Sequence, residues 1–149
     1  MCIGNFCNRN VVCARRDMTV VEAANLMRRH HVGNVVVAEE MADGQRPVGI
    51  VTDRDIVVEV VSAGLDPGLV KLGDLVLQPV VTVDDQTGYA DTIRLMSARG
   101  IRRLPVVNKV GLLVGIVSFD DLLHQLAVPL SELSEIAGRE WRLEAQTRK

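Results

Sequence analysis

The chain has 149 residues, of which 48% are apolar, and this is enough to bury one core or two small ones. Its 17 Lys and Arg against 19 Asp and Glu give a net charge of −2, so the composition lacks the basic surface of a nucleic-acid-binding protein. No apolar stretch approaches the roughly 20 residues that span a bilayer, and the opening MCIGNFCNRN does not resemble a signal peptide. We therefore expect a cytoplasmic globular protein with neither nucleic acid nor membrane as a partner.

The first half of the chain predicts strand, helix, strand, strand and helix in that order. β-branched residues at 11–14 indicate a short strand, and apolar residues at helical spacing from Val20 indicate a helix after it. Two further strands, 33–38 and 47–51, flank a turn at Gly44, and residues 53–64 predict a closing helix.

The second half repeats this order at a nearly constant offset. Residues 19–37 align with 88–106 at an offset of 69, and the offset falls to 66 after a surface loop that is three residues shorter in the second copy. The second copy contains a strand at 80–83, a helix at 88–100, strands at 102–107 and 112–117, and a helix at 119–127. The sequence therefore predicts an α+β fold built from two repeats of about 65 residues, packed sheet to sheet.

One motif occurs at the last strand-to-helix junction of each repeat: GIVTDRD at 49–55 and GIVSFDD at 115–121. Thr52 with Asp55, and Ser118 with Asp121, have the spacing of a capping box, which by itself accounts for both pairs. Thr19 and Glu22 form a third box of this kind. A hydroxyl at a helix N-terminus also suits a phosphate, and an acceptor-only carboxylate suits the hydroxyls of a ribose. The motif therefore leaves a structural and a ligand-binding interpretation open.

The doubled motif, together with RRLPVV in the preceding strand, resembles a tandem pair of cystathionine-β-synthase (CBS) domains of the stand-alone type. This places repeat 1 at 5–65, a linker with a short helix at 66–79, the core of repeat 2 at 80–128 with an entry segment from about 72, and an extra C-terminal helix at 129–149. The resemblance implies a β-α-β-β-α fold in each repeat. It also implies a regulatory, non-enzymatic module that binds adenosine-containing ligands such as AMP, ADP or ATP between the repeats, forms homodimers and reaches a protein effector in trans.

The resemblance also implies which residues line each cleft. One cleft should contain Ser118, Asp121 and Ile116, completed by Cys7 and Val12 of the N-terminal segment; the other should contain Thr52, Asp55, Ile50, Val76 and Val81. We expect Arg102 and Arg103 to face the phosphates in the Ser118 cleft, where the first repeat has Gly33 and Asn34 instead. The Ser118 cleft is therefore the predicted preferred site, unless Arg54, His30, His31 or a neighbouring subunit brings charge to the other.

Two other functions compete with nucleotide binding. The module could be an adaptor whose clefts are empty and structural. Alternatively, Cys2, Cys7 and Cys13 could form a metal or redox sensor, although their spacing lacks the C-x2-C pair of common zinc sites. No nucleophile with a supporting base is apparent, so we expect no catalytic residues, no metal and no required cofactor.

Residues 130–149 predict an amphipathic helix with one apolar stripe, formed by Leu130, Leu133, Ala137 and Trp141. We expect this helix to pack back on its own module, with another subunit or a partner protein as the alternatives.

Overall fold

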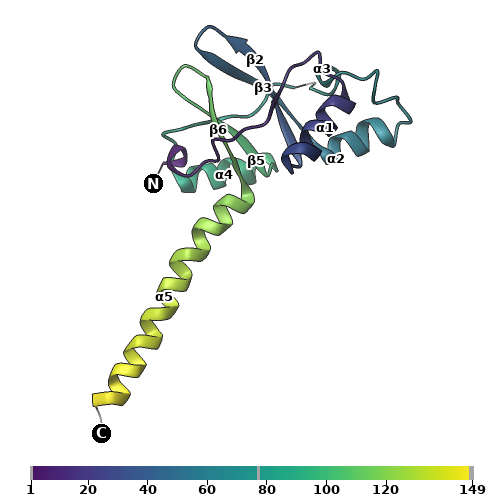
Figure 1. Cartoon of the computed structure of the whole chain (residues 1–149). Helices are drawn as coiled ribbons and strands as arrows, with labels where there is room; N and C mark the ends of the chain where they lie inside the picture. The colour runs from purple at the N-terminus through teal and green to yellow at the C-terminus, as the bar shows by residue number, and fades with distance from the viewer. Residues whose placement is uncertain (1, 77, 148–149) are drawn as a thin grey trace.

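The computed structural model describes residues 2–76 and 78–147, without the side chains of residues 137, 141, 144, 145 and 147. Two three-stranded sheets form the body, and a long helix projects from it (Figure 1). Within each sheet the first strand is parallel to the second, and the second is antiparallel to the third. The predicted α+β architecture of two β-α-β-β-α repeats is confirmed.

Repeat 1 follows the predicted order of elements. They are β1 (Cys13–Ala14), α1 (Val20–His30), β2 (Asn34–Met41), β3 (Gly44–Thr52), α2 (Asp53–Asp55) and η2 (Ile56–Val61). Thr19 caps α1 with its hydroxyl, and Glu22 returns a bond to the Thr19 backbone, as the box spacing predicts. The closing helix differs from a regular one, because it turns from α into π geometry at Ile56. Such π segments are frequent next to functional sites.

Repeat 2 has the same order but a much longer last helix. Its elements are β4 (Val83–Asp84), α4 (Tyr89–Arg99), β5 (Arg103–Val107), β6 (Leu113–Ser118) and α5 (Phe119–Thr147). The predicted break between two helices near Pro129 is absent, because α5 runs through this proline as one helix. The side chains beyond Leu126 that the structure describes are exposed, so this part of α5 does not pack back on its own module as we expected. No helix within the described ranges is long and apolar enough to cross a membrane.

Each repeat is completed by a segment from outside its own sheet. The N-terminal η1 (Ile3–Asn5) packs on repeat 2, where Ile3 is fully buried and Asn8 exchanges two backbone hydrogen bonds with Ile116. The linker helix α3 (Leu72–Leu75) packs on repeat 1 in the same way, with Leu72 fully buried in that core. The two repeats are therefore tied together by reciprocal segments at the place where the clefts form.

The glycine that opens each GIV motif makes these crossings possible. A Cβ on Gly49 would lie 2.5 Å from Val76, and a Cβ on Gly115 would lie 2.5 Å from the sulfur of Cys7. Cys7 and Val76 are separated by the same offset of 69 residues that relates the two repeats. The motif therefore needs glycine because the segment that completes each cleft lies directly against it.

Candidate functional site

The larger of the two predicted clefts lies between the C-terminal end of β3, the linker after α3 and the entry to β5. We call it the Thr52 cleft; its volume is about 760 Å³. It is lined by Gly49, Ile50, Thr52, Asp53, Arg54, Asp55, Leu75, Val76, Gln78, Val80, Val81, Gly100, Ile101, Arg102 and Arg103. This volume lies within the range of roughly 300–1,000 Å³ found for small-molecule pockets.

The polar end of the Thr52 cleft is built by the predicted capping box. The Asp55 carboxylate accepts a hydrogen bond from the Thr52 backbone N–H at 2.8 Å, and the Thr52 hydroxyl accepts one from the Asp55 backbone N–H at 3.1 Å. One acceptor and one donor remain without a partner among the described residues. The second oxygen of Asp55 accepts no hydrogen bond from them, and the Thr52 O–H donates to none of them. The box is therefore a cap that still offers one acceptor and one donor to a ligand.

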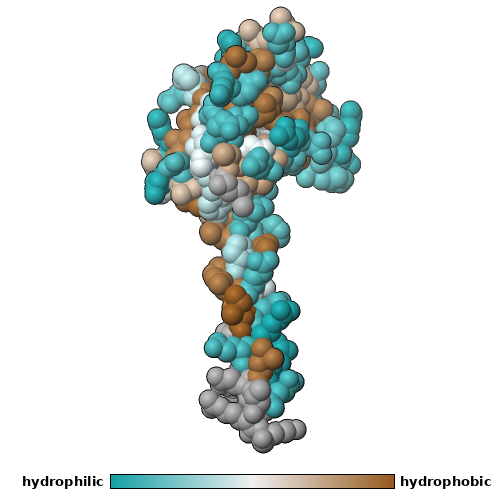
Figure 2. Space-filling view, turned by 90° about the vertical axis from the view of Figure 1, so that its left-hand side faces the viewer, coloured by the Kyte–Doolittle hydropathy of each residue, from teal (hydrophilic) through white to brown (hydrophobic). Residues whose placement is uncertain are grey.

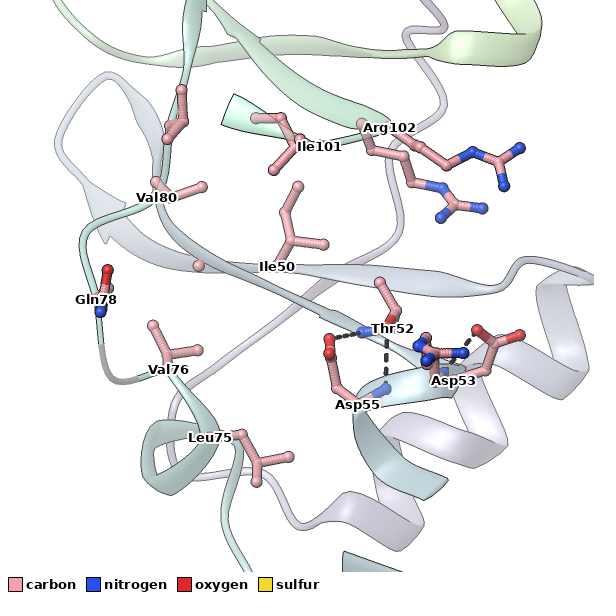
Figure 3. A pocket seen from close by; sticks show the side chains of 15 residues that line it. Ile50, Thr52, Asp53, Asp55, Leu75, Val76, Gln78, Val80, Ile101 and Arg102 are labelled. Atoms are coloured by element: carbon pink, nitrogen blue, oxygen red, sulfur yellow. Dashed lines mark hydrogen bonds between the residues drawn. The ribbon is translucent and has the colours of Figure 1, made fainter. Parts of the chain in front are cut away.

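The other end of the cleft is apolar. Figure 3 shows Ile50, Val80 and Ile101 gathered on one side of the capping box, with Val76 and Leu75 below them. These side chains come from three separate parts of the chain: β3, the linker and the entry to β5. Together they form a surface suited to a flat, largely apolar ring.

Three arginines give the Thr52 cleft its charge. Arg54, Arg102 and Arg103 line it, against two carboxylates, Asp53 and Asp55. Arg102 lies 5.3 Å from the centre of the Phe119 ring and 3.7 Å from Asp120, but its side chain is 70% exposed. An exposed ion pair of this length contributes little, so Arg102 remains available to an anion in the cleft.

The Ser118 cleft is smaller and carries the opposite balance of charge. Its volume is about 200 Å³, and it is lined by Asn8, Asn10, Val11, Val12, Val32, Gly33, Asn34, Arg103, Ile116, Ser118, Asp120 and Asp121. One arginine stands here against two aspartates. The Ser118 hydroxyl and backbone N–H both donate to the same oxygen of Asp121, at 2.6 and 2.8 Å. The hydroxyl proton that a phosphate would use is therefore already engaged.

The predicted residues are only partly grouped as the sequence suggested. Val12 and Ile116 line the Ser118 cleft, and the predicted residues of the Thr52 cleft all line that cleft. Arg102, however, lines the Thr52 cleft, and Arg103 lines both. The reason is that the helix-to-strand junction of each repeat faces the motif of the other repeat. The arginines at the entry to β5 therefore face Thr52, and Gly33 and Asn34 face Ser118.

Cys7 also differs from its predicted position. Its side chain is only 8% exposed and lies in the core of repeat 2 against Gly115, so it supports the wall behind the cleft without lining it. Burial raises the pKa of the thiols of Cys7 and Cys13 above the usual value, which keeps both protonated and unreactive. Within residues 2–76 and 78–147, no three His, Cys, Asp or Glu side chains come together as a metal site.

Gln78, Val80 and Ile101 line the Thr52 cleft but were not predicted to do so. The repeat offset could have found Val80, because it is equivalent to Val11, which lines the Ser118 cleft next to the predicted Val12. Ile101 could not be found from one sequence, since its place in the cleft depends on how the two sheets pack.

The fold and the paired clefts define a tandem module of two β-α-β-β-α repeats. The CBS domain family model matches residues 3–62 and 72–128. The chain therefore belongs to the CBS domain family and carries two copies of the domain.

Known proteins with the same organisation are similar over most of the chain. An uncharacterized protein of Methanopyrus kandleri is 40% identical over 122 residues, which are 82% of this chain and 61% of that protein, so the chain spans less than two thirds of its length. The crystal structure of Hypoxic Response Protein I with two coordinated zinc ions has a TM-score of 0.73 at 31% identity, covering 83% of this chain and 98% of that one. A CBS domain protein of Pyrobaculum aerophilum complexed with AMP has a TM-score of 0.72 at 28% identity, covering 86% and 99%.

Proposed function

We propose that this chain is a non-enzymatic, cytoplasmic regulatory module that binds an adenosine nucleotide of the AMP, ADP or ATP class. The Thr52 cleft is the main site in this proposal. The observation that carries it is the lining of that cleft, which combines apolar side chains, three arginines and an acceptor carboxylate. A nucleotide has parts of matching chemistry: a flat base, an anionic phosphate and a ribose.

Each part of the nucleotide has a group of suitable chemistry in the cleft. Ile50, Val80 and Ile101 would enclose the base, whose polar edge would be read by backbone groups of the linker. Asp55 would accept hydrogen bonds from the ribose hydroxyls, which deoxyribose can offer only in part. The Thr52 hydroxyl, Arg102 and Arg103 would hold the phosphate.

The Ser118 cleft would be the weaker site. Its volume of about 200 Å³ lies below the usual range for a ligand of this size, and its two aspartates would repel a phosphate. This order reverses the sequence-based prediction, because that prediction assigned both arginines to the Ser118 cleft. AMP bound to the Pyrobaculum aerophilum protein supports the class of ligand and does not distinguish the clefts.

The output of the module would be a change in shape or assembly that a protein effector reads in trans. Apolar side chains remain exposed on the closing helices of both repeats: Val57, Val58 and Val61 in repeat 1, and Phe119 and Leu123 in repeat 2. Exposed apolar side chains on the closing helices of both repeats support a homodimer. The π segment η2 follows directly on the Thr52 capping box, so a ligand at Thr52 would act next to the exposed side chains of repeat 1.

The test is a thermal-shift series on the purified chain with AMP, ADP, ATP, GMP and 2′-deoxy-AMP. An adenosine nucleotide at 100 times its dissociation constant should add about 2.7 kcal/mol to the stability of the fold. We expect AMP to shift the melting temperature more than 2′-deoxy-AMP or GMP at the same concentration. If no adenosine compound at millimolar concentration produces a shift, the module is an adaptor with empty clefts.

A further inference from the structure

Helix α5 extends far beyond the fold of repeat 2. Its first turns pack on the body, where Leu122 is buried, but from Leu130 onward it points away from both sheets (Figure 1). This outer part contains Gly138 and follows Pro129, whose missing N–H removes one hydrogen bond from the helix. A single helix of about 20 residues with these two features is marginal in water. Its stability therefore requires packing that its own module does not provide.

One side of α5 is suited to that packing. Phe119, Leu123, Leu126, Leu130 and Leu133 follow each other at steps of four, three, four and three residues, and each is 45–65% exposed. We call these five residues the α5 stripe. Figure 2 shows apolar surface continuing from the body along the projecting helix. An average spacing of 3.5 residues keeps such a stripe on one side of a helix that coils around another helix.

The charges of this region favour a partner that is itself neutral. Residues 128–149 hold four glutamates and four Arg and Lys residues, so the segment has no net charge. On the helix, Glu132, Glu135, Arg139 and Arg142 lie on the side opposite the stripe, at positions fixed by the helical repeat. A nucleic acid or an anionic membrane would need a basic face, which is absent from this arrangement. Two copies of this part of α5 can therefore pack together without net electrostatic repulsion.

The stripe is also continuous with an apolar groove on the body. Phe119, Leu123 and Leu126 line this groove together with Tyr89, Ile93 and Ile101, and its volume is about 410 Å³. Helix packing that begins along the stripe therefore continues onto the face that would be shared between two modules.

We propose that the α5 stripe pairs with the α5 stripe of a second copy of this chain, forming a two-helix coil that extends out of the dimer of modules. The outer part of the stripe, Leu130 and Leu133, lines neither nucleotide cleft, so pairing along it does not depend on a bound nucleotide. The coil would tie two modules together at one end, so that a change in the angle between them is transmitted along the paired helices.

The experiment is hydrogen exchange measured by mass spectrometry on the full chain, without nucleotide, at low and high protein concentration. Pairing predicts that amides of residues 130–143 are protected at least about tenfold more at tens of micromolar than at high dilution. Leu130→Glu and Leu133→Glu should each abolish this dependence, because either places a charge in the stripe. Val128→Glu is the matched control, since Val128 is a 47% exposed apolar residue on the other side of the same helix, and it should leave the protection intact.

The result that overturns the proposal is fast exchange of residues 130–143 in the unaltered chain at every concentration. Equal loss of protection in Val128→Glu and Leu130→Glu would also overturn it, because the effect would then come from the helix and not from the stripe. Thermal shifts with AMP are read separately, so a failure of nucleotide binding leaves this outcome unchanged.

Discussion

The two clefts of this chain are built from the same motif and differ in volume and in charge. Both have a hydroxyl and an aspartate in a capping box with nearly equal hydrogen-bond lengths. The Thr52 cleft has a volume of about 760 Å³ and three arginines, whereas the Ser118 cleft has about 200 Å³ and one arginine that both clefts share. The motif therefore fixes the local geometry, while the segment from the opposite repeat decides volume and charge.

Three equivalent positions of that opposite segment line the two clefts with different residues. Ile101, Arg102 and Arg103 line the Thr52 cleft, and Val32, Gly33 and Asn34 line the Ser118 cleft. One segment brings two permanent cations, and the other brings none. A duplicated fold has thus produced one cleft lined by more arginines than aspartates and one lined by more aspartates than arginines.

The largest expected effect is on AMP affinity, and it should differ between substitution of Asp55 and substitution of Asp121. Asp55→Asn should weaken AMP binding by about 1.5–3 kcal/mol, or about 10- to 150-fold, because it removes the charge and one acceptor from the group facing the ribose. Isothermal titration measures this, with Asp121→Asn as the matched control in the other cleft. We expect Asp121→Asn to change the tightest binding event less than threefold. The reverse pattern would move the main site to Ser118.

The second prediction concerns the glycines behind the clefts. Gly49→Ala should lower the free energy of unfolding by about 1–3 kcal/mol, because its methyl group would lie 2.5 Å from Val76. Denaturant unfolding of the single variants and of Gly49→Ala combined with Val76→Ala measures the coupling. The combined variant should lose less stability than the sum of the two single changes. Strict additivity would show that Val76 is not the contact that requires glycine.

Substitution of Arg102 should weaken ligand binding less than substitution of Asp55, and mainly for a ligand that carries a phosphate. Arg102→Ala should weaken AMP about tenfold and adenosine about twofold or less, because one charge-assisted contact to phosphate contributes about 1.5 kcal/mol. Titrating both ligands separates the phosphate contact from a general change in the cleft. An equal loss for adenosine and AMP would place Arg102 away from the phosphate.

The smallest effect tests whether Cys7 is a core residue or a sensor. Cys7→Val replaces it with the residue found at the equivalent position, Val76, and should change stability by less than about 1.5 kcal/mol. In the unaltered native chain, Cys7 should also be the slowest of the three cysteines to react with iodoacetamide, because its side chain is buried and those of Cys2 and Cys13 are partly exposed. Rapid labelling of Cys7 at neutral pH would reopen the redox interpretation.

The sequence could predict the parts of this molecule that depend on local patterns. The repeat, the order of strands and helices and the capping boxes at Thr52 and Ser118 follow from periodicity and spacing, and the structure contains them. The position of Arg102 could not be predicted in this way. It depends on which repeat faces which, and that is decided by β3 contacting β6 across the two sheets.

The C-terminal helix α5 also could be predicted only in part from the sequence. The sequence predicted two helices, at 119–127 and 129–149, because the repeat ends between them. In the structure α5 continues through Pro129, although the proline nitrogen cannot donate the hydrogen bond that a helical residue normally makes. Whether the outer helix packs inward or outward depends on surfaces that no single-sequence pattern reports.

A crystal structure of this chain with AMP would test the assignment of the main site. We predict AMP in the Thr52 cleft, with its ribose hydroxyls within hydrogen-bond distance of Asp55 and its phosphate facing Thr52, Arg102 and Arg103. We also predict lower occupancy, or none, in the Ser118 cleft. AMP bound only at Ser118 and Asp121, with the Thr52 cleft empty, would contradict this assignment.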